Sequence, residues 1–242
     1  MKRFFFLPVI FIFLNKNSNA QKQVTKLQQV WVGYINQTRF STKWGMWGDL
    51  QFYTKQDLFS NIYENIVTAG IVYYINNNTK LTAGYSYAHL YPTDNLAQPE
   101  HRPWQQVMWH SNYSRLHLVQ WFRLEERFRH KISNGELVDG YNFNYRARYN
   151  FLLIAALSKT AFAPNTISFV LNNELFINFG NQIVNNYFDQ NRFFIGFSYH
   201  TNKHDNLQFG YLNVFQELAA GNQYRSINAV RVIYFHNLDL RK

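Results

Sequence analysis

The stretch YNFNYRARYNFLL, residues 141–153, alternates between apolar and polar side chains. Positions 143, 145, 147, 149, 151 and 153 carry Phe, Tyr, Ala, Tyr, Phe and Leu. The positions from 142 to 150 that lie between them carry Asn, Asn, Arg, Arg and Asn. A period of two sustained over this length predicts a β-strand with one apolar and one polar face, because a helix would repeat every 3.6 residues.

The same period recurs along most of the chain. It is clear in residues 44–53, 166–180 and 192–200, and weaker in 63–75, 81–91, 102–113, 115–129, 207–216 and 225–237. Turn residues separate these segments, as at 76–79 and 133–135. No segment shows a helical period. The sequence therefore predicts a single all-β domain, an antiparallel up-and-down β-barrel of ten strands, with twelve as the alternative.

Composition agrees with two-faced strands. Aromatic residues make up 19% of the 242 residues although the mean hydropathy is negative, so apolar side chains must share short segments with polar ones. The chain contains no cysteine, which excludes a disulfide scaffold, a thiol nucleophile and any cysteine-ligated metal site.

The first twenty residues have the three parts of a secretory signal peptide. Lys2 and Arg3 precede an apolar run at 4–14, and Ser18-Asn19-Ala20 forms a small-x-small cleavage site. We expect cleavage after Ala20 and export. The longest later apolar run, 151–157, is far shorter than the roughly 20 residues of a membrane-spanning helix, so no such helix is expected.

Connection lengths suggest a topology. The shorter connections, near 76–79, 114, 158–165 and 201–206, alternate with longer ones near 54–62, 92–101, 130–140, 181–188 and 218–224. Outer-membrane barrels have short periplasmic turns and longer outside loops. Counting from Trp44 gives ten strands with both ends in the periplasm. Residues 44–242 would then form the barrel, and 21–43 an N-terminal extension or a first strand.

The placement of basic residues favours a transmembrane barrel over a soluble one. Lysines lie at strand ends and turns, whereas arginines lie within predicted strands. Water-facing sheets commonly carry lysine, while arginine beside glutamate suits a lumen filled with forked ion pairs. Glu126, on an apolar face, departs from this pattern. A soluble periplasmic barrel that holds an apolar ligand remains an alternative.

Several strings resemble the bacterial family known as domain of unknown function 2490, which is grouped with outer-membrane barrels. They lie in order at 100–106 (EHRPWQQ), 123–128 (RLEERF), 145–149 (YRARY), 173–176 (NELF) and 188–192 (FDQNR). The resemblance implies a barrel in the outer membrane of a Gram-negative bacterium. It implies no activity, and no catalytic residue can be carried over.

The candidate site is a set of polar residues expected to line the lumen: Arg102, Gln105, Arg123, Glu125, Arg127, Arg146, Arg148, Glu174 and Arg192. Opposed strands place such side chains about 5 Å apart at Cβ, within reach of bidentate pairing. The favoured interpretation is a structural ion-pair network that fills a narrow barrel. The alternative is an anion-selective constriction or an anion-binding lumen.

Other candidate chemistry is weak. His130, Ser133 and Asn134 resemble the residue types of outer-membrane phospholipases, but three-residue spacing at a turn does not orient a nucleophile. His200 and His204 flank a turn and have no third ligand. The positive charges form no stripe for nucleic acid.

We therefore expect a monomeric, non-enzymatic barrel without metal or cofactor, either a narrow porin-like pore or a structural or binding barrel. Its expected partners are outer-membrane lipid and a small anionic solute or glycolipid. The alternative function is an outer-membrane lipid-modifying enzyme that hydrolyses acyl esters.

Overall fold

The computed structural model describes residues 22–55 and 61–241, and the predicted signal peptide lies outside them. The described residues form eleven strands: β1 (Gln23–Arg39), β2 (Trp44–Thr54), β3 (Ile62–Tyr74), β4 (Thr79–Thr93), β5 (Leu96–Tyr113), β6 (Leu116–Ser133), β7 (Glu136–Ala156), β8 (Thr166–Phe179), β9 (Phe188–His200), β10 (Asp205–Glu217) and β11 (Gln223–Asp239). Within this part of the chain, no helix is long and apolar enough to cross a membrane.

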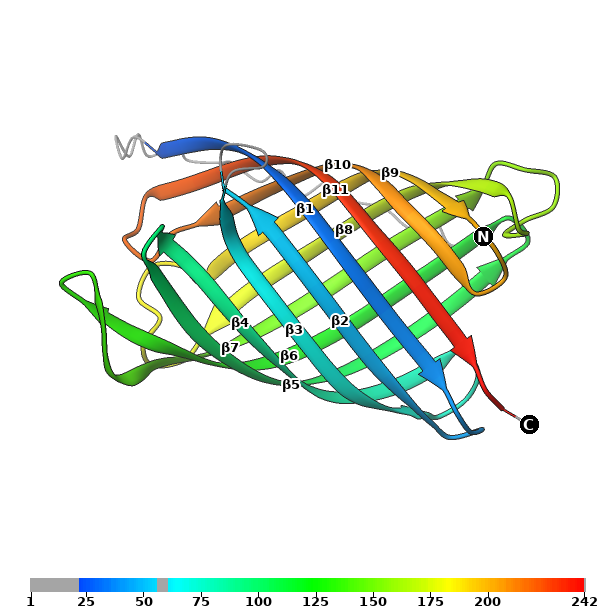
Figure 1. Cartoon of the computed structure of the whole chain (residues 1–242), viewed down its shortest axis with the longest axis horizontal. Coiled ribbons are helices and arrows are strands. Elements are labelled where there is room, and N and C mark those ends of the chain that lie inside the picture. Colours follow the sequence, from blue (N-terminus) through cyan, green and yellow to red (C-terminus); the bar gives the residue numbers. More distant parts are fainter. Residues whose placement is uncertain (1–21, 56–60, 242) are drawn as a thin grey trace, which may run out of the picture.

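The strands form one closed barrel in which sequence neighbours pair antiparallel and β1 closes the ring against β11 (Figure 1). The β1–β11 pair is parallel and runs in register from Gln23↔Gln223 to Arg39↔Asp239. Strands β2 to β11 correspond to the ten predicted segments. The all-β barrel is thus confirmed, and its eleven strands lie between the ten expected and the alternative twelve.

Strand β1 is the extra element, so 21–43 contains a first strand of the barrel. With eleven strands, β1 begins at one end of the barrel and β11 finishes at the other (Figure 1). The expectation that both ends lie on one side is therefore wrong for the whole barrel, although it holds for β2 to β11. We call the end at which β11 finishes the C end and the opposite end the N end.

The polarity pattern of β1 does not predict a strand of the barrel wall. Its inward residues Trp31 and Ile35 line an interior cavity, and its outward residues Val32 and Tyr34 are exposed. Because apolar and polar side chains occur on both faces, with the polar Gln29 and Gln37 also facing inward, the strand shows no alternation of polarity.

Two of the expected long connections are mostly strand. Strands β4 and β5 continue to Thr93 and Leu96, and β6 and β7 continue to Ser133 and Glu136. Asn134 and Gly135, with φ of 51° and 81°, form the two-residue turn that the right-handed twist of a hairpin favours. The β6–β7 hairpin extends beyond the rim of the barrel (Figure 1). The expected alternation of short and long connections is therefore wrong.

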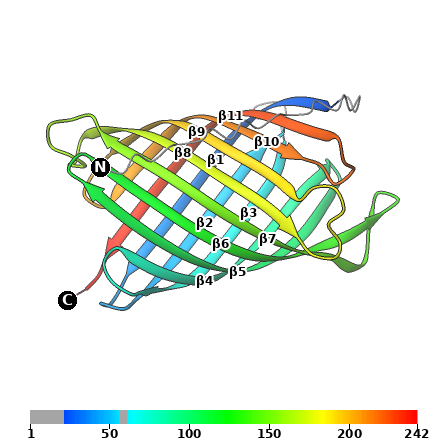
Figure 2. The ribbon, with the colours of Figure 1, turned by 180° about the vertical axis from the view of Figure 1, so that it is seen from behind.

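The barrel has its polar faces inside and its apolar faces outside. Ile71 and Val230 have 63% and 55% of their surface exposed, whereas Arg146 and Glu125 have 4% and 2%. Figure 2 shows the wall continuing from β4 to β9 on the other side, without a covering layer. Glu126 faces outward opposite Tyr145, as expected from its position.

The interior is filled by two kinds of side chain. One part is an apolar cluster that includes Trp31, Tyr53 and Phe194. The other part is charged. Trp104, only 1% exposed, lies against the backbone at Gly84, where an added Cβ would come within 2.3 Å of its ring. A larger residue at position 84 would therefore displace this indole.

Candidate functional site

Charged side chains from six strands meet in the middle of the barrel. They come from β3, β5, β6, β7, β8 and β9, and we call them the charge network: Glu64, Glu100, Arg102, Arg123, Glu125, Arg127, Arg129, Arg146, Arg148, Glu174 and Asp189. The period of two places most of these side chains on the inner face of their strands.

Glu100 is the first centre of the charge network. Its carboxylate accepts hydrogen bonds from the Nε atoms of Arg102 at 2.8 Å, Arg127 at 2.5 Å and Arg129 at 3.1 Å. Arg102 also donates from Nη2 to Glu64 at 2.8 Å. Glu100 is 1% exposed, so the N–H groups of these arginines replace the water that would otherwise solvate its carboxylate.

Glu125 is the second centre. It lies directly opposite Arg146, which contacts it at 2.5 Å, and Arg148 contacts its other oxygen at 2.5 Å. Arg146 also donates to Asp189 at 3.0 Å, and Arg148 reaches Glu174 at 2.5 Å. Each of these two arginines therefore bridges two carboxylates, which joins β6, β7, β8 and β9 across the interior.

Most of the predicted lumen residues face the interior. The structure places Arg102, Arg123, Glu125, Arg127, Arg146, Arg148, Glu174 and Arg192 there. Gln105 is misassigned: it is exposed on the outer face, because even-numbered positions of β5, such as Trp104 and Gln106, face inward.

The prediction omitted the carboxylates of Glu64, Glu100 and Asp189. Glu100 could have been found, since it lies two residues before Arg102 and so shares its face. Asp189 lies at the register shift between β8 and β9, where it has no partner across the strands, and both Asp189 and Gln190 are buried. A strict alternation therefore assigns Asp189 to the wrong face.

The charge network separates two interior cavities. The N-end cavity, of about 510 Å³, is lined by Gln182 and Leu218 from connections at that end. The C-end cavity, of about 380 Å³, is lined by Phe162 from a connection at the opposite end. Arg102 and Arg146 line both cavities, so these two side chains are part of the partition between them.

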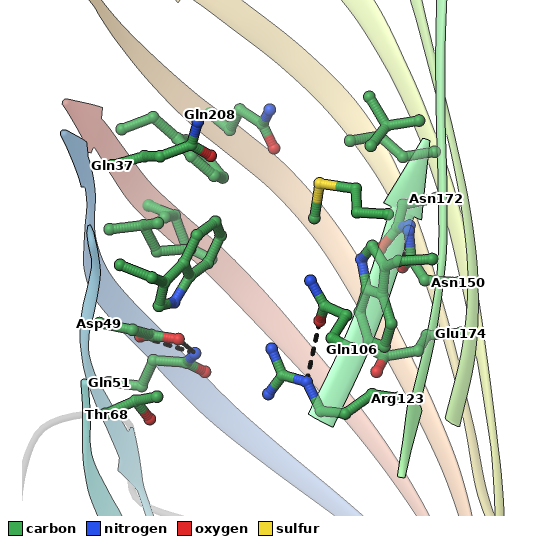
Figure 3. A pocket seen from close by; sticks show the side chains of 18 of the residues that line it. Gln37, Asp49, Gln51, Thr68, Gln106, Arg123, Asn150, Asn172, Glu174 and Gln208 are labelled. Carbon is green, nitrogen blue, oxygen red and sulfur yellow. Dashed lines mark hydrogen bonds between the residues drawn. The ribbon is translucent and has the colours of Figure 1, made fainter. Parts of the chain in front are cut away.

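The C-end cavity has polar walls on two sides (Figure 3). Asp49 and Gln51, which are hydrogen-bonded to each other at 2.8 Å, lie across it from Gln106 and Arg123. Arg123 donates to Gln106 at 2.9 Å, and its guanidinium stacks on Trp104 at 3.9 Å. The guanidinium of Arg123 is thus held between the aromatic face of Trp104 and the side-chain amide of Gln106.

Among the described residues, one serine is hydrogen-bonded to a histidine in the interior. Ser168 Oγ and His200 Nε2, on neighbouring strands β8 and β9, are 3.0 Å apart. Ser168 is 0% exposed, and none of the described carboxylates forms a hydrogen bond or ion pair with His200, so neither access nor an orienting group supports hydrolysis. Sequence spacing could not reveal this pair because its members come from different strands.

The weaker sequence candidates do not form sites. His130 packs on Tyr141 on the outer face, while Ser133 is exposed at the hairpin tip. His200 faces the C-end cavity and His204 lies in an exposed turn. Among the described residues, no group of three His, Asp or Glu side chains is arranged to hold a metal ion.

Fold and site together define a closed β-barrel with an apolar exterior and an interior divided by buried ion pairs. A family model described as a protein of unknown function, DUF2490, matches residues 28–225, from β1 to the start of β11. The chain belongs to the DUF2490 family, as the resemblance of its strings indicates. Comparisons with curated proteins and with solved structures give no match.

Proposed function

We propose that this chain is an integral β-barrel of a bacterial outer membrane whose lumen is closed to ions by the charge network. The observation that carries the proposal is the inverted distribution of polarity. A soluble barrel fills its interior with its apolar faces, whereas a membrane barrel turns them to lipid. Here the outward faces of all strands carry exposed apolar side chains, such as Leu50, Phe122 and Phe197.

Aromatic side chains near both rims support the same proposal. Trp44 and Tyr73 pack edge to face near the C end, with ring centroids 5.1 Å apart. Toward the N end, His101 lies between Tyr87 and Tyr141, at 5.1 Å and 5.8 Å. Transmembrane barrels carry such girdles at the two membrane interfaces, because aromatic side chains with a polar group suit the headgroup region.

The charge network favours a closed barrel over an open pore. Its carboxylates are hydrogen-bonded to arginine at distances as short as 2.5 Å, and most of its side chains are buried. An open channel would leave such groups in water, where paired charges contribute little. We therefore assign the network a structural role, and the lumen a role in binding.

Membrane extraction tests this proposal. We expect the exported chain to stay in the outer-membrane fraction after carbonate washing, and the folded barrel to migrate differently from the boiled one on a gel. Release into the soluble fraction by carbonate would contradict membrane insertion and restore the soluble barrel.

A charge on the outer face gives a second test. Ile195 faces outward between Leu171 and Tyr211, and Phe193 and Phe197 flank it on its own strand. We expect Ile195→Arg to lower the free energy of unfolding in lipid vesicles by about 2–4 kcal/mol, the cost of arginine near a bilayer midplane. Ile195→Val, which stays apolar, is the control. Equal unfolding of the arginine and valine variants would argue that this face meets water.

A further inference from the structure

We propose that the C-end cavity binds a small amphipathic carboxylate, with its charged head on Arg192 and Arg231 and its apolar body directed toward the C end. The site lies entirely in the interior, so binding there does not depend on what surrounds the outer face of the barrel.

The C-end cavity carries arginine side chains that have no carboxylate partner among the described residues. Arg192 and Arg231 both line the C-end cavity, and neither has a carboxylate within ion-pair distance among the described residues. Arg123, which lines the same cavity, has its nearest carboxylate at 3.8 Å, on Glu125. This cavity therefore differs from the charge network, in which every carboxylate is closely paired with arginine.

The three carboxylates that line the same cavity, on Asp49, Glu125 and Glu174, do not neutralise this surplus. Glu125 is held by Arg146 and Arg148, and Glu174 by Arg148, each at 2.5 Å. Asp49 accepts hydrogen bonds from Gln51 and forms no ion pair with Arg192 or Arg231. An anion in the cavity would supply the missing partner for two guanidinium groups, which bind carboxylates through their planar fork of N–H donors.

Two buried N–H donors of the C-end cavity have no hydrogen-bond partner among the described residues. Arg231 donates from Nη2 to Gln208 at 3.1 Å, but its buried Nε has no hydrogen-bond partner among the described residues. The indole Nε1 of Trp47, which lines the same cavity, is buried and equally unsatisfied. Buried donors without partners cost stability, so a cavity that holds two of them is suited to a ligand with acceptor oxygens.

The orientation of the ligand follows from the inward residues of β11. From the middle of the barrel toward the C end they are Arg231, Ile233, Phe235 and Asn237, and all four line the cavity. Two residues of strand rise by roughly 7 Å, so the apolar stretch beyond the guanidinium is about 10 Å long. A head on Arg231 would thus place an apolar body of two rings, or of about eight carbons, along Ile233 and Phe235.

The C-end cavity adjoins a further cavity at the C end of the barrel. A third cavity, lined by turn residues Asn77 and Lys203 of the C end, shares Lys80, His110 and Asn237 with the C-end cavity. At the other side, Arg102 and Arg146 of the charge network form the floor. A volume of about 380 Å³ lies within the range of small-molecule sites.

Titration calorimetry with 1-naphthoate tests the proposal, using the folded full-length mature barrel in detergent with empty micelles as the blank. We expect saturable binding of 1-naphthoate and at least about tenfold weaker binding of the uncharged 1-naphthamide, the difference that one charge-assisted bidentate contact supplies. Arg231→Gln and Arg192→Gln should each weaken naphthoate binding by about tenfold.

Arg225→Gln is the matched control, because Arg225 faces the N-end cavity and donates to Tyr63 at 3.0 Å. Its naphthoate affinity should equal that of the unaltered protein. No saturable binding, equal binding of the amide, or equal weakening by Arg225→Gln would overturn the proposal. If an arginine variant does not fold, the affinities of the unaltered protein for 1-naphthoate and for 1-naphthamide still test the proposal. Any of these failures would leave membrane insertion standing.

Discussion

Replacing Glu100 by glutamine is expected to lower the free energy of unfolding by about 3–5 kcal/mol, the range for removing one partner from a buried ion pair. Glu100 is 1% exposed and accepts from three arginines, and two of these, Arg102 and Arg127, are themselves buried. Glutamine preserves the size of the side chain but removes its charge. The arginines would then remain buried with less compensation.

Urea unfolding in lipid vesicles, followed by tryptophan fluorescence and by the folded gel band, measures this effect. Glu136→Gln is the control, since Glu136 is exposed on the β6–β7 hairpin and belongs to no ion pair among the described residues. It should change the free energy of unfolding by less than about 0.5 kcal/mol. A Glu100→Gln variant as stable as this control would show that the charge network contributes nothing to the fold.

The strands of the barrel wall could be predicted because the alternation of apolar and polar side chains along a strand is visible in the sequence. Where one face meets charge and the other is apolar, as in 141–153, the alternation gives both the strand and the orientation of its side chains. The pattern thus predicts that Arg146 and Arg148 face the interior, where the structure has them. The same reasoning identified ten of the eleven strands.

The parts that could not be predicted are those where the pattern breaks. In β1, Trp31 packs into the apolar cluster of the interior, so polarity does not distinguish its two faces. Gln105, predicted to line the lumen, faces outward because its neighbours Trp104 and Gln106 both face inward. At Asp189 the register shift changes the phase of the strand, and only the pairing of β8 with β9 reveals it.

The alternation of side chains along a strand also gives no indication that β1 pairs in parallel with β11. Which strand meets which depends on the number of strands and on contacts between residues about 200 positions apart, such as Asn36 Nδ2 to the carbonyl of His236 at 3.4 Å. Consequently the sequence could predict the residues of the charge network better than the division of the lumen that they produce. The partition requires all six strands to be in place.

Removing one ion pair from that partition is expected to turn a silent barrel into a conducting one. In a planar lipid bilayer the unaltered protein should give no current steps, because Arg102 and Arg146 separate the two cavities. The double variant Glu125→Ser/Arg146→Ser takes out one negative and one positive charge at the contact of 2.5 Å. Arg148 keeps Glu174, and Asp189 keeps Arg127 at 3.7 Å, so these two partners of the pair stay compensated. Arg123 loses its contact of 3.8 Å with Glu125 and keeps its hydrogen bond to Gln106.

With Arg146 replaced by serine, the C-end and N-end cavities lose a side chain that lines both, and water and ions should pass between them. We expect discrete steps whose reversal potential in asymmetric salt favours anions, since arginines outnumber carboxylates among the described interior side chains. Lys131→Ser/Glu136→Ser removes the same charges from the exposed hairpin and should stay silent, which separates a local opening from a general loosening. Steps of equal size in the unaltered barrel would mean that the charge network lines an open pore, and that its arginines act on passing anions.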